Sequence, residues 1–426
     1  MKEDFLHYLW RFKLWTKPLR TEDNQHITVL NPGIYNTDGG PDFLQAKLHI
    51  GNTIWAGSVE IHVSASDWIA HRHTADSAYD NVILHVVVYN DIPIIHPRSH
   101  TPIPCCCIQG MYKASQHALY EQWQANKSFV ACEKEIAQLS PVKRTFLLER
   151  LCIESFERKV NEISDDLARN QYSWEETFYQ YLLRSFGLKI NADVFYNLAK
   201  SLKTTILLSN SDNLLLLEAL LFGQANLLEQ NFSDAYPNEL KKHYQFLKTK
   251  YSLSSIHPTT VQFLRLRPIS FPTLRLALFA QFIHQHKQLF SIVVELTDLA
   301  YLRHNFQLTA SAYWDTHYLF DKASTNRPKR LGIDTQDLII INSVLPFAFA
   351  YGRLRDNRDL CERAIQLMNE LPAENNTILK AWSDCGITPH NTCEAQGLLQ
   401  LKKYFCDEQK CFSCSVGIEL INKIGI

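Results

Sequence analysis

The first hundred residues pass from a helical to a strand-like pattern of apolar positions. Residues 4–17 place Phe5, Leu9 and Phe12 on one face, which predicts an amphipathic helix closed by Pro18. Beyond this helix, apolar and polar residues alternate, and turns containing Gly or Pro separate the alternating runs. The alternation predicts strands at 26–30, 43–50, 53–63 and 82–89. The last run, VILHVVVY, is apolar almost throughout, which is typical of a strand buried on both faces.

After about residue 111 the apolar spacing becomes helical, and strand-like alternation nearly disappears. Helical segments are predicted at 142–166, 174–186, 191–203, 213–229, 272–288, 335–350 and 357–370. The chain from about residue 385 is short and rich in cysteine. We therefore predict an α+β protein in three parts: a small mixed-sheet module at 1–110, a large helical domain at 111–384 and a cysteine-bearing tail at 385–426.

Composition narrows the classes of function. The chain has 426 residues, is 46% hydrophobic and carries a net charge of −1, so no global field draws it to nucleic acid. Its charged, amphipathic start lacks the apolar core of a secretory signal, and no apolar run reaches the ~20 residues that a membrane helix needs. A cytoplasmic protein without a membrane segment is expected. Its eleven cysteines then indicate buried thiols or metal ligands more than disulfides.

Two carboxylates and an imidazole form the sharpest motif. Asp42 follows a Gly-Gly-Pro turn, and Glu60 and His62 share one face of the strand predicted at 53–63. Carboxylate oxygens are the ligands that Mg²⁺ and Mn²⁺ prefer, and a histidine can accept a proton from an attacking water. We predict catalytic roles for all three residues, with Asp42 and Glu60 as metal ligands. The alternative is that Asp42 serves its turn and the other two lie on a solvated face.

A second group of possible ligands follows closely in the sequence. His71, His73 and Asp76 stand within six residues, and His62 or His85 could complete a zinc site with them. His85 lies inside the apolar strand, where a buried neutral histidine with a hydrogen-bond partner is the simpler interpretation.

The first 110 residues carry a resemblance to a known superfamily. Pro41-Asp42 followed by Glu60-Ile61-His62 resembles the PD-(D/E)xK nucleases, and the predicted order of strands and helices is similar to their common core. The resemblance implies a nuclease-like module in which Asp42 and Glu60 bind the metal. His62 stands where that superfamily usually has a lysine. Lys47 could replace that lysine, although ideal alternation puts it on the face opposite Asp42.

The tail holds four cysteines in the spacing Cys393-x12-Cys406-x4-Cys411-x2-Cys414. Thiolates bind Zn²⁺ or an iron–sulfur cluster, so we predict a structural metal centre in the tail. Only one close pair is present, whereas zinc ribbons usually have two. This difference favours a 4Fe-4S cluster over zinc, and Cys385 is an alternative to Cys393 as a ligand.

The helical part offers fewer chemical signals. Glu218 is embedded among leucines, and a buried carboxylate needs a partner, for which the arginines at 265, 267 and 275 are candidates. Substrate-binding residues are predicted in the basic loop that contains Arg327, Lys329 and Arg330, where phosphate contacts could form beside aromatic side chains.

Taken whole, the chain resembles an uncharacterised bacterial family of unknown function, through the motifs GPDF, VEIH, DW-x2-H-x-H and ILHVV, the EALLFGQ-like helix and the tail cysteines. That resemblance implies no activity. From the residues and the nuclease resemblance we expect a metal-dependent, nuclease-like phosphodiesterase acting on nucleic acid. The alternatives are a non-catalytic scaffold that binds nucleic acid or protein on a decayed nuclease core, and a zinc-dependent hydrolase of a small substrate.

Overall fold

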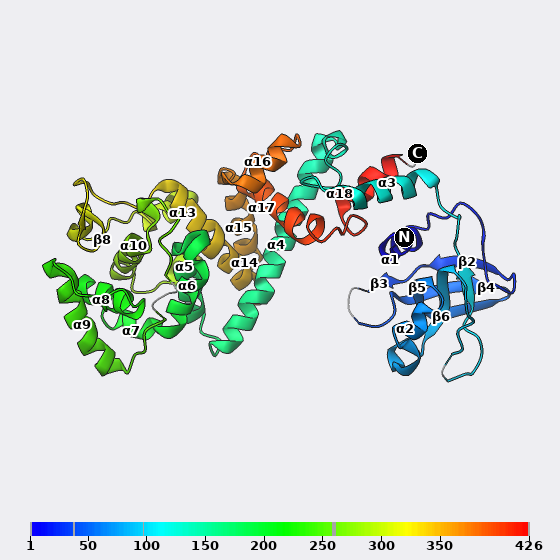
Figure 1. The fold of residues 1–426 in the computed structure, drawn as a ribbon, viewed down its shortest axis with the longest axis horizontal. Coiled ribbons are helices and arrows are strands. Elements are labelled where there is room, and N and C mark those ends of the chain that lie inside the picture. Colours follow the sequence, from blue (N-terminus) through cyan, green and yellow to red (C-terminus); the bar gives the residue numbers. More distant parts are fainter. Residues whose placement is uncertain (1, 37–38, 97, 258–260, 425–426) are drawn as a thin grey trace. The chain divides into compact units, whose positions relative to one another are not determined.

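The protein is described by a computed structural model that covers residues 2–36, 39–96, 98–257 and 261–424. Its internal contacts divide it into two units (Figure 1). The sheet unit contains the chain up to Leu147, together with Ala381–Ile387 and the tail from Leu399. The helical unit contains Leu148–Lys380 and Thr388–Leu398. An N-terminal mixed sheet followed by a large helical region confirms the predicted α+β class.

The sheet unit is built on strands in the order β1-β2-β4-β5-β6-β7, with β3 paired to β4. The strands are β1 (Leu19–Arg20), β2 (His26–Asn31), β3 (Ile34–Tyr35), β4 (Phe43–Ile50), β5 (Thr53–Ser64), β6 (Val82–Tyr89) and β7 (Cys105–Cys107). Pairing is antiparallel from β1 to β5 and parallel from β5 to β7. Gly51, with φ of +59°, makes the tight turn between β4 and β5 that the sequence predicts.

The connection between the parallel strands β5 and β6 covers one face of the sheet. It contains α2 (Asp67–Ala70) and the short helices η1 (His73–Ala75) and η2 (Ser77–Tyr79). Trp68 and Tyr79 from this connection pack with Val87 of β6 in a small apolar cluster. The connection therefore closes over the strand that carries the predicted catalytic residues.

The first helix is shorter than its apolar pattern predicts. Helix α1 (Glu3–Arg11) ends at Arg11 rather than at residue 17. Lys13 has φ of +54°, and the N–H of Leu14 donates to the carbonyl of Leu9. α-Helices commonly end in this way, with one residue in the left-handed conformation after the last turn. Apolar spacing alone does not reveal a left-handed residue that is not glycine.

The sheet unit also contains helices outside the sheet. They are α3 (Ala114–Ala125), η3 (Ile136–Gln138), the π-helical turn η7 (Lys402–Cys406) and α18 (Ser415–Ile424), and the last two lie in the tail. Phe412 of the tail packs against Phe5 and Tyr8 of α1. The tail residues from Leu399 thus belong to the same unit as the sheet, and α1 is their packing partner.

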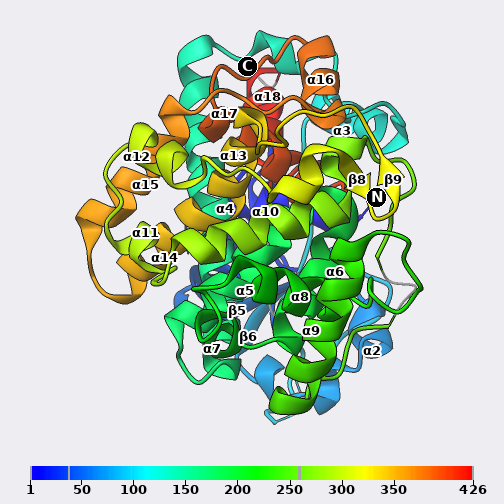
Figure 2. The ribbon, with the colours of Figure 1, turned by 90° about the vertical axis from the view of Figure 1, so that its left-hand side faces the viewer.

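The helical unit contains most of the remaining elements. These are α4 (Pro141–Arg169, which begins in the sheet unit), α5 (Trp174–Phe186), α6 (Leu188–Ser201), α7 (Thr204–Leu208), α8 (Leu214–Gln224), α9 (Ala235–Tyr251), η4 (Pro268–Ser270), α10 (Pro272–Gln285), α11 (Ser291–Val294), α12 (Leu299–Asn305), η5 (Ala312–Asp315), β8 (His317–Leu319), β9 (Lys322–Ala323), α13 (Ile333–Ile339), η6 (Ile340–Val344), α14 (Leu345–Leu354), α15 (Arg358–Glu370), α16 (Thr377–Asp384, shared with the sheet unit) and α17 (Thr392–Leu401, shared likewise). Figure 2 shows α10 lying across α5 and α8.

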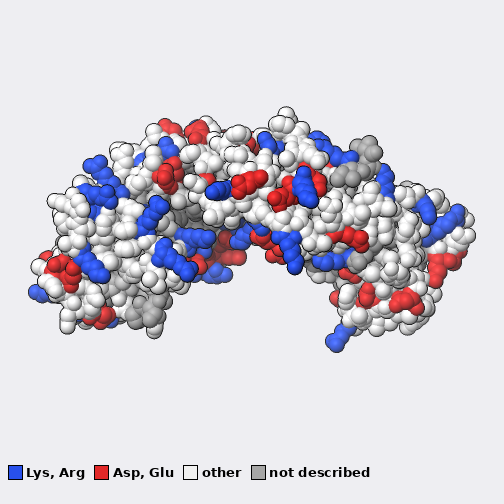
Figure 3. All heavy atoms as spheres, turned by 45° about the horizontal axis from the view of Figure 1, so that its top comes forward, with Lys and Arg blue, Asp and Glu red and all other residues white. Residues whose placement is uncertain are grey.

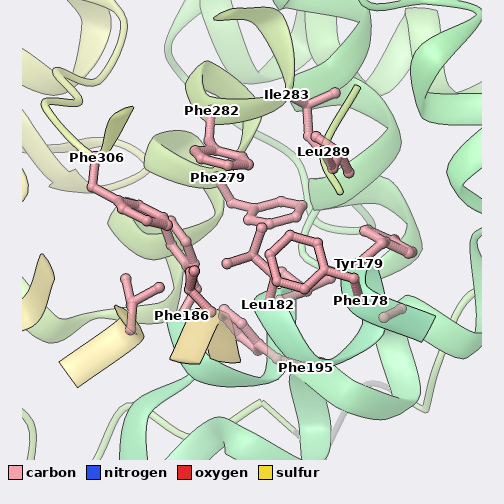
Figure 4. Packing of buried hydrophobic residues seen from close by; sticks show 14 of the residues in the cluster. Phe178, Tyr179, Leu182, Phe186, Phe195, Phe279, Phe282, Ile283, Leu289 and Phe306 are labelled. Carbon is pink, nitrogen blue, oxygen red and sulfur yellow. The ribbon is translucent and has the colours of Figure 1, made fainter. Parts of the chain in front are cut away.

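Aromatic side chains fill the centre of the helical unit. Phe186 of α5 meets Phe279 of α10 edge to face, with ring centroids 5.1 Å apart, and Phe282 stacks on Phe306 at 5.2 Å (Figure 4). The stretch Ile333–Leu354 is long and apolar enough to cross a membrane, but most of it is buried in this core. Its apolar character is therefore explained by packing.

Charged side chains of both signs are interspersed on the surface of each unit, as the face drawn in Figure 3 shows. This agrees with the net charge of −1. Any contact with a charged partner must therefore use a local group of residues.

Candidate metal centre

The β4–β5 pairing brings the two predicted carboxylates together. Phe43 pairs with Val59, so Asp42, just before β4, lies beside Glu60 on β5. The backbone N–H of Asp42 donates to Oε2 of Glu60 at 3.1 Å, and the N–H of Ile61 donates to Oδ2 of Asp42 at 2.9 Å. Two reciprocal hydrogen bonds fix the carboxylates, and Glu60 is only 4% exposed.

Two histidines contact the other oxygen of Glu60, and a third contacts one of these two. His62 follows on β5, and α2 with the left-handed residue Arg72 (φ of +62°) returns His71 and His73 to the same place. One ring nitrogen from each of the three histidines lies within 4.8 Å of the other two. The structure thus brings His62, His71 and His73 together, although two of them lie outside the strand.

Three distances between these ligand atoms are close to those in a tetrahedral metal site. Nε2 of His62 lies 3.4 Å from Oε1 of Glu60 and 3.2 Å from Nδ1 of His71. Nε2 of His73 lies 3.3 Å from the same oxygen of Glu60. A tetrahedral ion with bonds of about 2.05 Å separates its ligand atoms by about 3.3 Å. One ring nitrogen from each of the three histidines can thus bind a single divalent cation and leave a fourth position open, with Oε1 of Glu60 beside two of these nitrogens.

Burial sets the protonation of this group. It raises the pKa of Glu60 to about 9, with a further contribution from the charge of Asp42. It lowers the pKa of His62 to about 2, helped by the neighbouring histidines, and it also lowers the pKa of His73. The contacts of Glu60 with these two histidines are therefore not ion pairs. Neutral imidazoles are the form that binds metals.

Two further histidines touch the site: His85, which the sequence offers as an alternative zinc ligand, and His7, for which the sequence predicts no role. Nδ1 of His62 lies 2.9 Å from Nε2 of His85 on β6, which pairs in parallel with β5. Nε2 of His7 on α1 lies 3.2 Å from Oδ2 of Asp42, and its Nδ1 lies 3.4 Å from the hydroxyl of Tyr35. His85 has the buried position that its apolar strand predicts. His7 carries no sequence signal, because one histidine on an amphipathic helix does not indicate a partner.

The remaining sequence-predicted site residues lie apart from these ligand atoms. Asp76 accepts a hydrogen bond from the N–H of Ala78 and caps η2. Lys47 is exposed and lines a separate cleft over the β4–β5 hairpin, where Gly57 and Asn81 also lie.

In the helical unit, the predicted substrate-binding residues have mostly structural contacts. Nζ of Lys329 is buried and donates to the carbonyl oxygens of Asp315, Thr325 and Arg327. The guanidinium of Arg327 donates to the hydroxyl of Tyr318, and Arg330 is exposed. The expected arginine partners of Glu218 are not its hydrogen-bond partners.

The tail cysteines fall into two groups. Cys406, Cys411 and Cys414 belong to the sheet unit and line one small cavity there. Cys393 belongs to the helical unit, where it is fully buried and hydrogen-bonded to the thiol of Cys152. Cys385 lies in the sheet unit but not among the residues that line this cavity.

The fold and the site together define an α+β protein with a buried imidazole–carboxylate centre on its sheet. The chain belongs to the family described as "Protein of unknown function (DUF2851)", whose family model matches residues 3–377. The membership predicted from the sequence motifs is confirmed, and the match names no activity, so the nuclease resemblance stays a prediction. No match was found among curated proteins or among solved structures.

Proposed function

We propose that the sheet unit is a metal-dependent hydrolase of phosphodiester bonds, with nucleic acid as its substrate class. The observation that carries the proposal is that one ring nitrogen from each of His62, His71 and His73 lies within 4.8 Å of the other two, with Oε1 of Glu60 3.3–3.4 Å from His62 and His73. The substrate class rests on the sequence resemblance of the Pro41-Asp42 and Glu60-Ile61-His62 motifs to nucleases.

The ligand set favours a transition metal. Three imidazoles suit Zn²⁺ and leave its fourth position open to a water, whereas Mg²⁺ prefers oxygen ligands. The metal of the proposal is therefore Zn²⁺, rather than the Mg²⁺ or Mn²⁺ that two carboxylates alone indicate. When bound, such an ion supplies Lewis-acid activation of a water and of the phosphate.

Asp42 and His7 stand on the more open side of the centre. The Asp42 side chain is 20% exposed and that of His7 is 15% exposed, against 5% for Glu60. This pair can take the proton of an attacking water, since a histidine held by a carboxylate is a common general base. Water oxygen then adds to phosphorus, the bond to the leaving oxygen breaks, and that oxygen receives a proton.

The decisive experiment uses the full chain, stripped of metal and reloaded with Zn²⁺, Mn²⁺ or Mg²⁺. Cleavage of single- and double-stranded DNA and RNA is measured for the wild type, for Glu60→Gln and for Asp76→Asn. We expect the zinc-loaded wild type to cleave, Glu60→Gln to lose at least ~100-fold in rate, and Asp76→Asn to retain activity, because Asp76 caps η2 and is not among the ligand atoms.

The outcomes separate the alternatives. Zinc bound at the histidines without cleavage of any nucleic acid would reject this substrate class and leave the zinc-dependent hydrolase of a small substrate. Binding of nucleic acid without metal and without cleavage would favour the scaffold. Full activity of Glu60→Gln would reject the metal centre itself.

We also propose a cytoplasmic location. None of the eleven cysteines forms a disulfide in the described part of the chain, and cysteines that stay reduced suit a reducing compartment.

A further inference from the structure

A cysteine distant in sequence joins the tail cysteines around one cavity of the sheet unit. The cavity is lined by Cys132, Cys406, Cys411 and Cys414, together with Trp123, Ala131, Phe405 and Gly417. Cys132 lies in the loop after α3, where its carbonyl accepts the N–H of Ile136 at 2.9 Å. Cys406 ends η7, and the other two cysteines lie just before α18.

The backbone around the cavity is closely packed. A Cβ atom on Gly417 would lie only 2.1 Å from the carbonyl oxygen of Cys411, so a residue without a side chain is needed for α18 to approach this loop. Phe412, between the two cysteines of the loop, is buried against Tyr120 of α3 at 4.9 Å between ring centroids. The loop that carries Cys411 and Cys414 is thus packed against both α18 and α3.

The four thiols are close enough to affect one another's charge. Burial, and then the neighbouring Cys414, raise the pKa of Cys411 to about 12. Burial and the charges of Cys414, Cys132 and Cys411 raise the pKa of Cys406. These mutual effects agree with the shared cavity, whose lining brings the four side chains together.

We propose that Cys132, Cys406, Cys411 and Cys414 bind one metal centre through four thiolates. Cys132 takes the place that the sequence gives to Cys393, which is buried in the helical unit beside Cys152. A closed four-thiolate set leaves no open position for substrate, so the centre is structural and ties the loop after α3 to the tail. Zn²⁺ and an iron–sulfur cluster share this thiolate chemistry, and the test separates them.

The first measurement is made on the full chain purified without oxygen. Broad visible absorption with iron and sulfide in stoichiometric amounts identifies a cluster, and a colourless protein whose thiolates hold zinc identifies a zinc site. Either result supports a metal centre at the cysteines. Four metal-free thiols after reconstitution with zinc, and with iron and sulfide, would overturn it.

The choice of ligands is tested with matched cysteine variants. Cys132→Ser and Cys406→Ser are expected to lose the metal, whereas Cys393→Ser, at a more deeply buried position, is expected to keep it. For zinc, Co²⁺ replacement gives a thiolate-to-cobalt absorption band to which the histidine site does not contribute. Loss of this band, or of the cluster absorption, in Cys393→Ser but not in Cys132→Ser would overturn the assignment.

A measurement on the unaltered chain covers the case in which a variant fails to fold. Thiols are alkylated in the metal-loaded protein before and after a chelator is added. Cys132, Cys406, Cys411 and Cys414 are expected to become reactive together, while Cys393 stays protected in both states. If Cys132 reacts equally in both states while the tail cysteines become exposed, Cys132 is not a ligand.

Discussion

His62 on β5 and His85 on β6 are joined through their ring nitrogens, with Nδ1 of His62 2.9 Å from Nε2 of His85. The contact leaves Nε2 of His62 directed at Glu60 and His71. If Nδ1 carries the proton, it donates to His85, and the lone pair on Nε2 is available to a metal. A partner of this kind fixes the tautomer and the ring orientation of a metal-binding histidine.

We predict that His85 positions His62 without contacting the metal itself. His85→Phe removes the acceptor but keeps a ring in the buried strand, and we expect zinc affinity at the histidine site to fall about 10–100-fold. His85→Gln retains an acceptor and should recover part of that loss. Zinc affinity is measured by competition with a chromogenic chelator. Equal affinity in His85→Phe and the wild type would show that the contact does not position His62.

Metal removal is predicted to destabilise the sheet unit. A ligand at 100 times its Kd stabilises the folded state by about 2.7 kcal/mol, so zinc should raise the unfolding temperature of this unit. His73→Ala should abolish the share of the shift that comes from the histidine site. Since His73 also stacks on Tyr79, with ring centroids 3.8 Å apart, the zinc-induced shift is compared and not the absolute temperature.

The control for that comparison is Asp76→Asn, which leaves the ligand atoms in place and should keep the full shift. Thermal unfolding is followed by circular dichroism with zinc and after chelation. The same zinc-induced shift in His73→Ala as in the wild type would place the stabilising metal elsewhere in the chain.

The sequence predicts those parts of the site whose geometry depends on the local pattern of residues. Alternation along β5 puts Glu60 and His62 on one face, and the Gly-Gly-Pro turn delivers Asp42 to the neighbouring strand. His7 could not be predicted, because its contact with Asp42 depends on how α1 packs against the sheet. Cys132 escaped prediction for the same reason, since the packing of α3 and the tail brings it to the cavity.

The local pattern likewise predicts the burial of Glu218 but not its hydrogen-bond partners. Its burial follows from the leucines around it, but its hydrogen-bond partners come from α9 and from η5's N-cap. The sequence alone suggests a positively charged partner for this carboxylate, with the arginines at 265, 267 and 275 as candidates. Arg275 instead contacts Thr335. The hydroxyl groups of Tyr236 and Ser311 donate hydrogen bonds to the buried carboxylate, in place of the expected cation.

Gly223 is predicted to be essential for the packing of α8 against α9. A Cβ atom at this position would lie 2.0 Å from Cγ of Tyr244, whose hydroxyl donates to Gln224. Gly223→Ala should therefore destabilise the helical unit by about 3 kcal/mol. Gly332→Ala is the control without a clash: its Cβ would meet nothing within 4 Å, and because Gly332 is the N-cap of α13, a loss of only about 1 kcal/mol is expected. Urea unfolding of both variants checks this, and equal stabilities would contradict the packing argument.

Glu218 is predicted to make the helical unit less stable as pH rises. Burial raises its pKa to about 6, although the hydroxyls of Tyr236 and Ser311 each donate to it at 2.7 Å. In the unfolded chain the pKa is about 4.3–4.5. The folded state thus binds the proton more tightly, so this contribution to stability is complete below about pH 4.5 and is lost as pH rises through 6. The loss reaches about 2 kcal/mol by pH 8.

Glu218→Gln keeps the shape and can still accept hydrogen bonds, but it cannot ionise. The stability of this variant relative to the wild type should therefore rise by about 2 kcal/mol between pH 4.5 and pH 8. Comparing the two proteins at each pH cancels the titration of every other group, which an absolute unfolding profile cannot do. A difference in stability that does not change with pH would mean that the pKa of Glu218 is the same in the folded and unfolded states, and that the two hydroxyls offset its burial completely.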